Sequence, residues 1–220
     1  MKIMRSYGEY CAIAQSLDVL GERWTLLIVR ELLIRGSCRY TDIQNGLPGI
    51  PTNLLAERLR GMEKAGIIYR EAAPPPVATT LFHLTERGKE LKPVLDSLGK
   101  WGRPLVTRPI GDDSFRSHWL KLPLEAHLKD TRPDQPPITV ELRTGDEPMI
   151  LQTVEGAVRV TPGHARNPDA VVTGTGSQVL GLLTGKLDLA EARRRGLQLE
   201  GAEAAVDRVA LPPQAPSPAC

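Results

Sequence analysis

The 220-residue sequence has little of what several common protein classes need. Aromatic residues make up only 4% of it, so its cores must be mainly aliphatic. Its three cysteines, Cys11, Cys38 and Cys220, have neither the spacing of a metal site nor that of a disulfide framework. No stretch approaches 18 uninterrupted apolar residues, and no apolar run follows a basic start at the N-terminus. We therefore expect no membrane span, no signal peptide and a cytoplasmic location.

Catalytic signatures are also missing. The four histidines, His83, His118, His127 and His164, are scattered without the spacing of metal ligands. The sequence has no nucleophile elbow, phosphate-binding glycine loop or zinc motif. The sequence thus predicts no enzyme, no catalytic residues, no metal and no cofactor.

Charge is unevenly distributed, although the formal net charge is only +2. Residues 1–110 contain 16 basic and 11 acidic side chains, a balance of +5. Residues 111–220 contain 12 and 15, a balance of −3. The length allows one large or two small domains, and this asymmetry favours two domains with different roles. The basic excess alone does not establish nucleic-acid binding.

Two helical patterns precede a turn. Residues 12–34 have helical spacing that is interrupted at Gly21. In the segment RYTDIQNG, Thr41 can cap a short helix and Gln44 can complete a capping box. The Leu-Pro-Gly sequence at 47–49 then predicts a turn.

An amphipathic helix follows the turn, within the stretch GIPTNLLAERLRGMEKAGII at residues 49–68. Its apolar stripe consists of Leu55, Leu59 and Met62. Its start is open between two alternatives, with either Pro51 as the first helical residue or Thr52 as the N-cap. Gly66 ends the helix.

Strand patterns at 67–72 and 79–84 come next, joined by a proline-rich connection at 73–78. Thr85 then caps a further helix over residues 86–101. Helix, turn and helix followed directly by a β-hairpin is the order of a winged helix-turn-helix, whose second helix lies in the DNA major groove. Because the proline-rich connection carries no basic residue, we expect few electrostatic contacts from it.

Residues 10–103 resemble the HxlR-type branch of MarR-like transcriptional regulators. The resemblance rests on the blocks CAIAQSLDVLGERWTLLIVRELL, RYTDIQNGLPGIPTNLLAERLRGMEKAGIIYR and FHLTERGKELKPVLDSLGKWG. It implies a DNA-binding domain over residues 1–110, with double-stranded DNA as partner and a homodimer joined by the terminal helices. Where the family usually has a serine before the recognition helix, this chain has Pro51.

Recognition of base edges in the major groove requires side chains that are short or flexible and that carry hydrogen-bond donors or acceptors near the start of the helix. Asn53 suits adenine, Arg60 suits guanine and Glu57 suits cytosine, whereas peripheral cations suit phosphates. We predict DNA contacts from Arg39, Thr41, Thr52, Asn53, Ala56, Glu57, Arg60, Lys64 and Arg70. For each of them the alternative is a solvated surface side chain.

Two apolar helix faces are candidates for a homodimer interface. They contain Ile13, Leu17 and Leu20 in one helix, and Leu91, Leu95, Leu98 and Trp101 in the other. The alternative is that both faces pack within one subunit. Cys11 stands where HxlR-type proteins often carry a cysteine, and in some of them it senses oxidants. A structural thiol is the alternative here, since no vicinal cysteine supports redox sensing.

The second half predicts an α+β domain over residues 111–210, followed by a disordered tail at 211–220. An amphipathic segment near the start is broken or kinked at Pro123. Strand patterns follow at 138–142, 149–154, 157–162, 170–175 and 197–201. Helix patterns lie at 177–185, 188–196 and 202–210.

The order of these strands, together with VLGLLTGKLDLAEARRRGLQLEG, resembles a sterol-carrier-protein-like domain. This resemblance implies an apolar ligand cavity, which we expect to be lined by Trp119, Leu180, Leu183 and Leu187. An ordinary filled core is the alternative.

The sequence therefore predicts a mainly α N-terminal winged helix-turn-helix domain plus an α+β C-terminal domain. The function it favours is a homodimeric, sequence-specific DNA-binding transcriptional regulator on an inverted-repeat operator, modulated by a small apolar effector. The alternative is a lipid- or acyl-binding carrier whose winged helix serves protein contacts.

Overall fold

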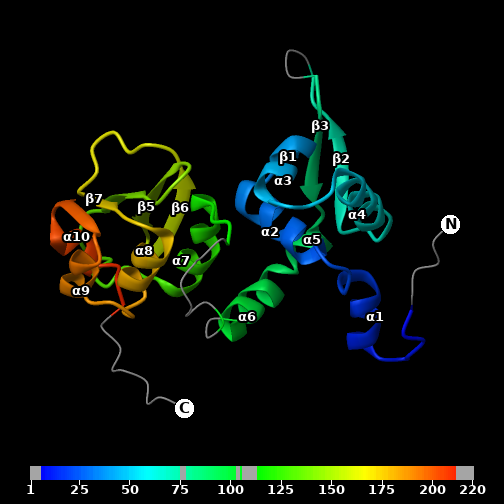
Figure 1. The fold of residues 1–220 in the computed structure, drawn as a ribbon, viewed down its shortest axis with the longest axis horizontal. Helices are drawn as coiled ribbons and strands as arrows, with labels where there is room; N and C mark the ends of the chain where they lie inside the picture. The colour runs from blue at the N-terminus through cyan, green and yellow to red at the C-terminus, as the bar shows by residue number, and fades with distance from the viewer. Residues whose placement is uncertain (1–5, 75–77, 103–104, 106–112, 212–220) are drawn as a thin grey trace. The chain divides into compact units, whose positions relative to one another are not determined.

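A computed structural model of the chain describes residues 6–74, 78–102, 105 and 113–211. The chain divides into two compact units, residues 1–103 and 104–220 (Figure 1). The predicted domain boundary at residue 110 and all but the first residue of the predicted disordered tail lie outside the described residues.

The N-terminal unit has the element order predicted from the sequence. Its helices are α1 (Ala12–Leu20), α2 (Thr25–Arg35), α3 (Tyr40–Gly46), α4 (Thr52–Lys64), α5 (Glu86–Lys89) and α6 (Lys92–Gly102). Its strands are β1 (Cys38–Arg39), β2 (Ile68–Ala72) and β3 (Thr80–Leu84). These strands form an antiparallel sheet in the order β1-β3-β2, with β1 as a short strand that the sequence pattern did not reveal.

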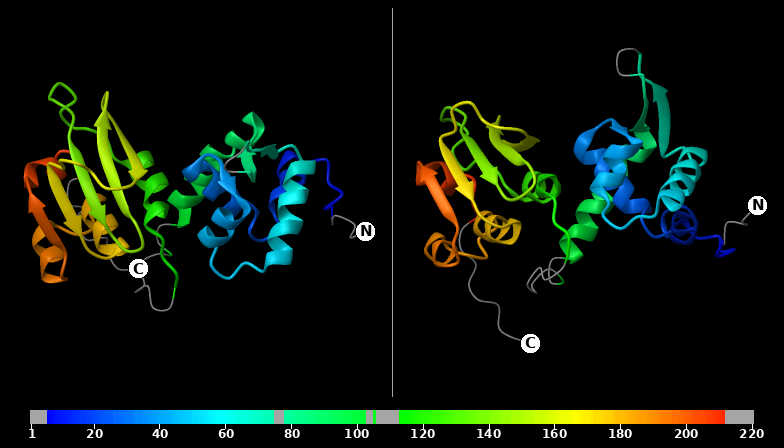
Figure 2. Two further views of the ribbon diagram at one scale, coloured as in Figure 1. Left: turned by 90° about the horizontal axis from the view of Figure 1, so that it is seen from above. Right: turned by 45° about the horizontal axis from the view of Figure 1, so that its top comes forward.

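The helix-turn-helix consists of α3, the turn after it and α4, and the hairpin β2–β3 follows at once (Figure 2). The predicted stripe of α4 is confirmed, because Leu55, Leu59 and Met62 are all buried. They pack in one core with residues of α2, such as Ile28 and Leu32. This burial holds α4 against the unit and leaves its opposite face open.

Three local predictions in this unit were wrong. Thr41 does not cap α3, because it lies inside the first turn, where Asp42 accepts the backbone N–H of Arg39 at 2.9 Å. Neither alternative for α4 holds, since Pro51 is the N-cap residue and Thr52 is already helical. The predicted helix at 86–101 is two helices, α5 and α6, because Pro93 lacks the N–H that a continuous helix would need and its ring clashes with the preceding turn.

The residues that end α4 and begin α5 are the ones that the sequence predicts for these positions. Gly66 follows α4 with φ +71°, a conformation that favours glycine. The Thr85 hydroxyl accepts the Gly88 N–H at 3.0 Å, which confirms it as the cap of α5. The tip of the proline-rich connection, residues 75–77, lies outside the described residues.

The C-terminal unit is an α+β structure around a five-stranded mixed sheet. Its strands are β4 (Thr139–Arg143), β5 (Pro148–Val154), β6 (Ala157–Pro162), β7 (Ala170–Thr173) and β8 (Gln198–Gly201). Their order is β6-β5-β4-β7-β8, in which β4 and β7 are parallel and the other pairs antiparallel. The helices are η2 (Ser117–Leu120), α7 (Lys121–His127), α8 (Gly176–Leu183), α9 (Leu189–Arg194) and α10 (Glu203–Asp207).

The predicted strands and the last three helices of this unit are confirmed to within a few residues. The break predicted at Pro123 is wrong in position. The change from the 3₁₀ helix η2 to α7 falls at Lys121, and Pro123 lies in the first turn of α7, where its missing N–H is no loss.

One face of the sheet carries the core of this unit. Val140 and Leu142 of β4 and Met149 and Leu151 of β5 are fully buried, in a cluster that also contains residues of the helices. Side chains alternate along a strand, so the residues between them point to the opposite face of the sheet. Among the described helices, none combines the length and apolar character that crossing a membrane requires.

Candidate nucleic-acid interface

The exposed face of α4 carries four of the predicted DNA-contacting residues. Asn53, Glu57, Arg60 and Lys64 are all exposed, about half a helical turn from the buried stripe. Thr52 is exposed at the first helical position, and Ala56 is half-buried beside this face. The helix therefore presents a polar surface of small, amide, cationic and acidic groups.

The N-terminus of α4 is held in place by the preceding helix. The Tyr40 hydroxyl, on the first residue of α3, donates to the Thr52 carbonyl at 2.7 Å. No side chain caps α4, because its N-cap residue is Pro51. The first backbone N–H groups of α4 are thus left for solvent or an anion, which the helix dipole favours at this end.

The cations of α4 differ in what they contact. Arg58 is only 15% exposed in its side chain, and its guanidinium lies 2.7 Å from a carboxylate oxygen of Glu22, in the segment before α2. Glu57 lies 3.9 Å from the same guanidinium. In contrast, Arg60 and Lys64 make no salt bridge with any described residue. Arg58 therefore fastens α4 to the unit, and the other two cations are unpaired on its open face.

The predicted phosphate-contacting residues outside α4 also differ in whether their charge is already paired. Arg39 and Thr41 are exposed around the start of α3. Arg70, on β2, pairs with Glu63 at 2.8 Å, and this hydrogen bond raises the pKa of the guanidinium. The charge of Arg70 is therefore partly compensated, which weakens it as a phosphate contact.

The outer face of the hairpin carries a cluster that sequence reasoning missed. Tyr69 and His83 are cross-strand partners whose rings stack at 4.9 Å. The His83 Nε2 atom lies 3.1 Å from a carboxylate oxygen of Glu71. The alternation of β2 and β3 brings these three residues to one face, and the strand pattern alone could have indicated this.

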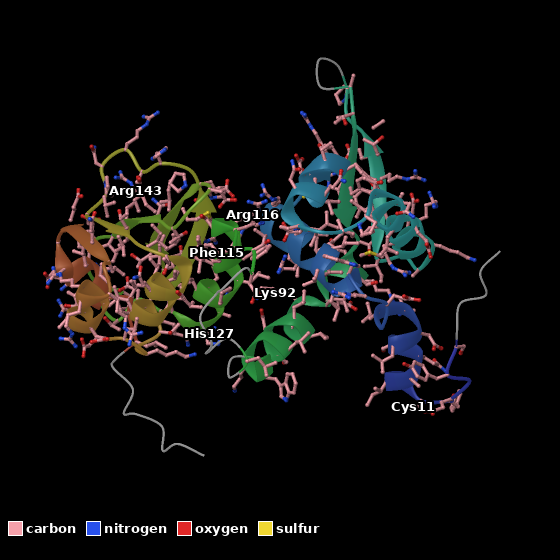
Figure 3. The ribbon with its side chains drawn as sticks, in the orientation of Figure 1. Cys11, Lys92, Phe115, Arg116, His127 and Arg143 are labelled. Atoms are coloured by element: carbon pink, nitrogen blue, oxygen red, sulfur yellow. The ribbon has the colours of Figure 1, made fainter. Side chains whose placement is uncertain are left out.

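Two cysteines have contrasting environments. Cys11 is exposed at the N-cap of α1 (Figure 3), where the backbone N–H groups of Ala14 and Ile13 lower the pKa of its thiol. Cys38 is fully buried in β1, and burial raises its pKa to about 12. Of these two cysteines, only Cys11 therefore combines exposure with a lowered thiol pKa, the two conditions that favour reactivity. Cys220 lies outside the described residues.

The predicted dimer faces divide between internal packing and exposure. Leu20, Leu91 and Leu95 pack against the core of their own unit, as the alternative interpretation expects. Other members of the same faces are exposed, namely Ile13 (73%), Leu17 (44%), Leu98 (47%) and Trp101 (72%). The internal packing thus accounts for only part of each face, and the homodimer stays a prediction.

Three of the four predicted cavity residues lie in or against the C-terminal core. Leu183 is fully buried, and Leu180 and Leu187 pack against the same cluster. Trp119 is half-buried, with Phe115 and His118 at its ring edges. This packing favours the filled-core alternative, and the cavity between sheet and helices stays a prediction.

The N-terminal unit is thus a winged helix-turn-helix, the architecture of a transcriptional regulator. Residues 19–109 match the model of the HxlR-like helix-turn-helix family. The chain is 37% identical over 87 residues to the uncharacterised HTH-type transcriptional regulator YvaP of Bacillus subtilis, covering 40% of this chain and 80% of that protein. It is 38% identical over 95 residues to sll1512 of Synechocystis, described in the same words, covering 43% of this chain and 70% of that protein.

The chain therefore belongs to the HxlR-like helix-turn-helix family. Among solved structures, the reduced form of the transcriptional regulator YodB from B. subtilis aligns at 30% identity, covering 45% of this chain and 97% of that one, with a TM-score of 0.39. The family match ends at residue 109, so the resemblance of the C-terminal unit to sterol-carrier-protein-like domains stays a prediction.

Proposed function

We propose that this protein is a sequence-specific DNA-binding transcriptional regulator that binds an inverted repeat as a homodimer. The observation that carries the proposal is the pair of unpaired cations on the open face of α4, Arg60 and Lys64. A cation without an internal partner loses no ion pair when it meets DNA. Arg58, by contrast, would have to leave Glu22 first.

Within this proposal, the residues of α4 contact different parts of the DNA. Asn53 and Arg60 read base edges in the major groove, and Glu57 reads cytosine or discriminates against other bases. The uncapped start of α4 and Thr52 hold a phosphate, while Lys64 and Arg39 contact phosphates at the periphery. The hydrogen bond from the Tyr40 hydroxyl to the Thr52 carbonyl fixes the start of α4, and with it the position of these contacting groups relative to the DNA.

The dimer in this proposal uses the exposed apolar residues of α1 and α6. One recognition helix reads too few bases for tight specific binding, so proteins of this architecture use two half-sites related by the two-fold axis of the protein. Ile13, Leu17, Leu98 and Trp101 supply the apolar surface that such an interface needs.

The C-terminal unit acts as the effector module of the regulator, which works in the cytoplasm. A ligand of this unit changes operator affinity only if it binds more tightly to one relative placement of the two DNA-binding domains of the dimer than to another. The change in operator binding free energy cannot exceed this difference in ligand binding free energy. The apolar effector predicted from the sequence would enter between sheet and helices, near Leu180 and Leu187.

Selection from random DNA duplexes tests this proposal. We expect enrichment of an inverted repeat, and a protein with 6–10 phosphate contacts would lose ~10³–10⁵ in affinity for it between 50 and 200 mM salt. If no sequence is enriched, the regulator proposal fails. The carrier alternative would then be favoured, with the winged helix contacting protein rather than DNA.

A further inference from the structure

The C-terminal unit has a pocket on the face of its sheet opposite the helices. The loop that joins β6 to β7 must pass β5 and β4, because the strand order is β6-β5-β4-β7 (the yellow connection in Figure 1). It passes on the open face, and a pocket of about 380 Å³ lies between loop and sheet. Its floor consists of Thr139, Ile150 and Gln152, and residues 164–167 of the loop form its wall.

The loop is clamped at its beginning by a buried carboxylate. The side chain of Glu141, on β4, is only 2% exposed, yet it points to the open face. It accepts the Ala165 N–H at 2.8 Å and lies 3.2 Å from Nδ1 of His164. Arg143, labelled in Figure 3, donates to it at 2.7 Å. These hydrogen bonds hold the pKa of Glu141 below its usual range, against the effect of burial.

The end of the loop is clamped as well. The Asp169 carboxylate accepts the Thr139 N–H at 2.7 Å, and the Asp169 N–H donates to the Thr139 carbonyl at 2.8 Å. In the floor, the Gln152 amide donates to the Thr139 hydroxyl at 3.2 Å. The wall is thus fixed at both ends before any ligand arrives, so binding costs little ordering entropy.

Two cations near the pocket make no ion pair with any described residue, Arg166 in its wall and Arg159, the cross-strand partner of Gln152 in its floor. Glu141 is paired with Arg143, and the Asp169 carboxylate accepts the Thr139 N–H. The Arg166 guanidinium in the wall, together with amide groups and the Ile150 side chain of the floor, suits a carboxylate with a short apolar part.

We propose that this pocket binds a small organic carboxylate, whose carboxylate group pairs with Arg166 and whose apolar part lies on Ile150. The site differs in place and chemistry from the apolar cavity that the sequence predicts between sheet and helices. It would serve as the effector site of the proposed regulator, but the binding itself does not depend on DNA.

The test uses the full chain, labelled with ¹⁵N, and hexanoate and benzoate as probes. We expect saturable shifts of the Ala165, Arg166 and Asn167 amide signals with at least one carboxylate. The matched neutral amides, hexanamide and benzamide, should bind about 10-fold more weakly or not at all, because they lose the charge-assisted contact. Inorganic phosphate should also bind more weakly than the carboxylate.

Arg166→Gln should weaken carboxylate binding about 10-fold or more. Arg132→Gln makes the same change at an exposed site outside the pocket and should leave binding unchanged. The proposal is overturned if neither carboxylate shifts these signals, if the amides or phosphate bind as well, or if Arg166→Gln binds like the wild type while circular dichroism shows it folded. Operator binding by the unliganded protein is measured separately, so failure here is distinct from failure of the proposed function.

Discussion

Arg58 and Arg60 stand two residues apart on α4 and should have opposite roles. Arg58→Ala removes a guanidinium 2.7 Å from Glu22 and a side chain that is 85% buried, since only 15% of it is exposed. A partly exposed ion pair contributes up to ~1 kcal/mol, and each buried methylene contributes ~0.8 kcal/mol. We expect Arg58→Ala to lower the free energy of unfolding by roughly 2 kcal/mol.

Arg60→Ala should behave in the opposite way. Its side chain is exposed and makes no ion pair with any described residue, so stability should change by less than about 0.5 kcal/mol. Loss of a base contact should weaken operator binding by ~1–3 kcal/mol, which is about 5- to 150-fold.

Urea unfolding followed by circular dichroism, together with operator titrations, measures both effects in the full chain. A double-mutant cycle of Arg58→Ala with Glu22→Ala should give a coupling of ~0.2–1 kcal/mol. The reasoning is refuted if Arg60→Ala binds the operator like the wild type, or if Arg58→Ala is as stable as the wild type.

Three further predictions concern the core, the thiols and the buried ion pair. Leu55→Ala should lower the free energy of unfolding by ~2–5 kcal/mol in urea titrations, because its side chain is fully buried. Iodoacetamide should alkylate Cys11 with an apparent pKa below that of free cysteine and leave Cys38, with its pKa of about 12, unmodified in the folded protein. Arg208 holds the pKa of Asp130 below its usual range, so this pair's stabilisation is present above the unfolded pKa, near ~4, and is lost as the pH falls through the folded pKa.

Each of these has its own control. The alkylation is done in a Cys220→Ser background, and equal rates at both cysteines would contradict the environments described. For the ion pair, Asp130→Asn should remove part of the acid dependence of unfolding, and Glu200→Gln, at an exposed position on β8, should not. For the core, Leu17→Ala, at an exposed position on α1, should leave the free energy of unfolding of the monomer nearly unchanged.

The sequence predicted best those features that a short window of residues decides. The stripe of Leu55, Leu59 and Met62 needs only helical spacing, and all three are buried. The strand patterns at 149–154 and 157–162 leave two residues between them, and Glu155 and Gly156 there both have positive φ, as a type I′ hairpin turn requires.

Contacts between residues that are far apart in the sequence could not be predicted from such short windows. Glu22 and Arg58 are 36 positions apart, and nothing in either local pattern pairs them. The clamp of Glu141 on Ala165 needs the strand order, which fixes where the β6–β7 loop crosses. The division at Pro93 was readable, because proline inside a helix removes a hydrogen bond, but the stripe of leucines suggested a continuous helix.

Base discrimination by Asn53 tests the central claim, that the open face of α4 reads DNA sequence. Asn53→Ala and wild type are titrated against the selected operator and against its single-base variants. Gln198→Ala, which removes an exposed side-chain amide on β8 outside the pocket, is the control. The account predicts that Asn53→Ala loses ~1–3 kcal/mol of discrimination at one base pair per half-site and keeps its non-specific affinity. An unchanged sequence preference in Asn53→Ala would contradict the account.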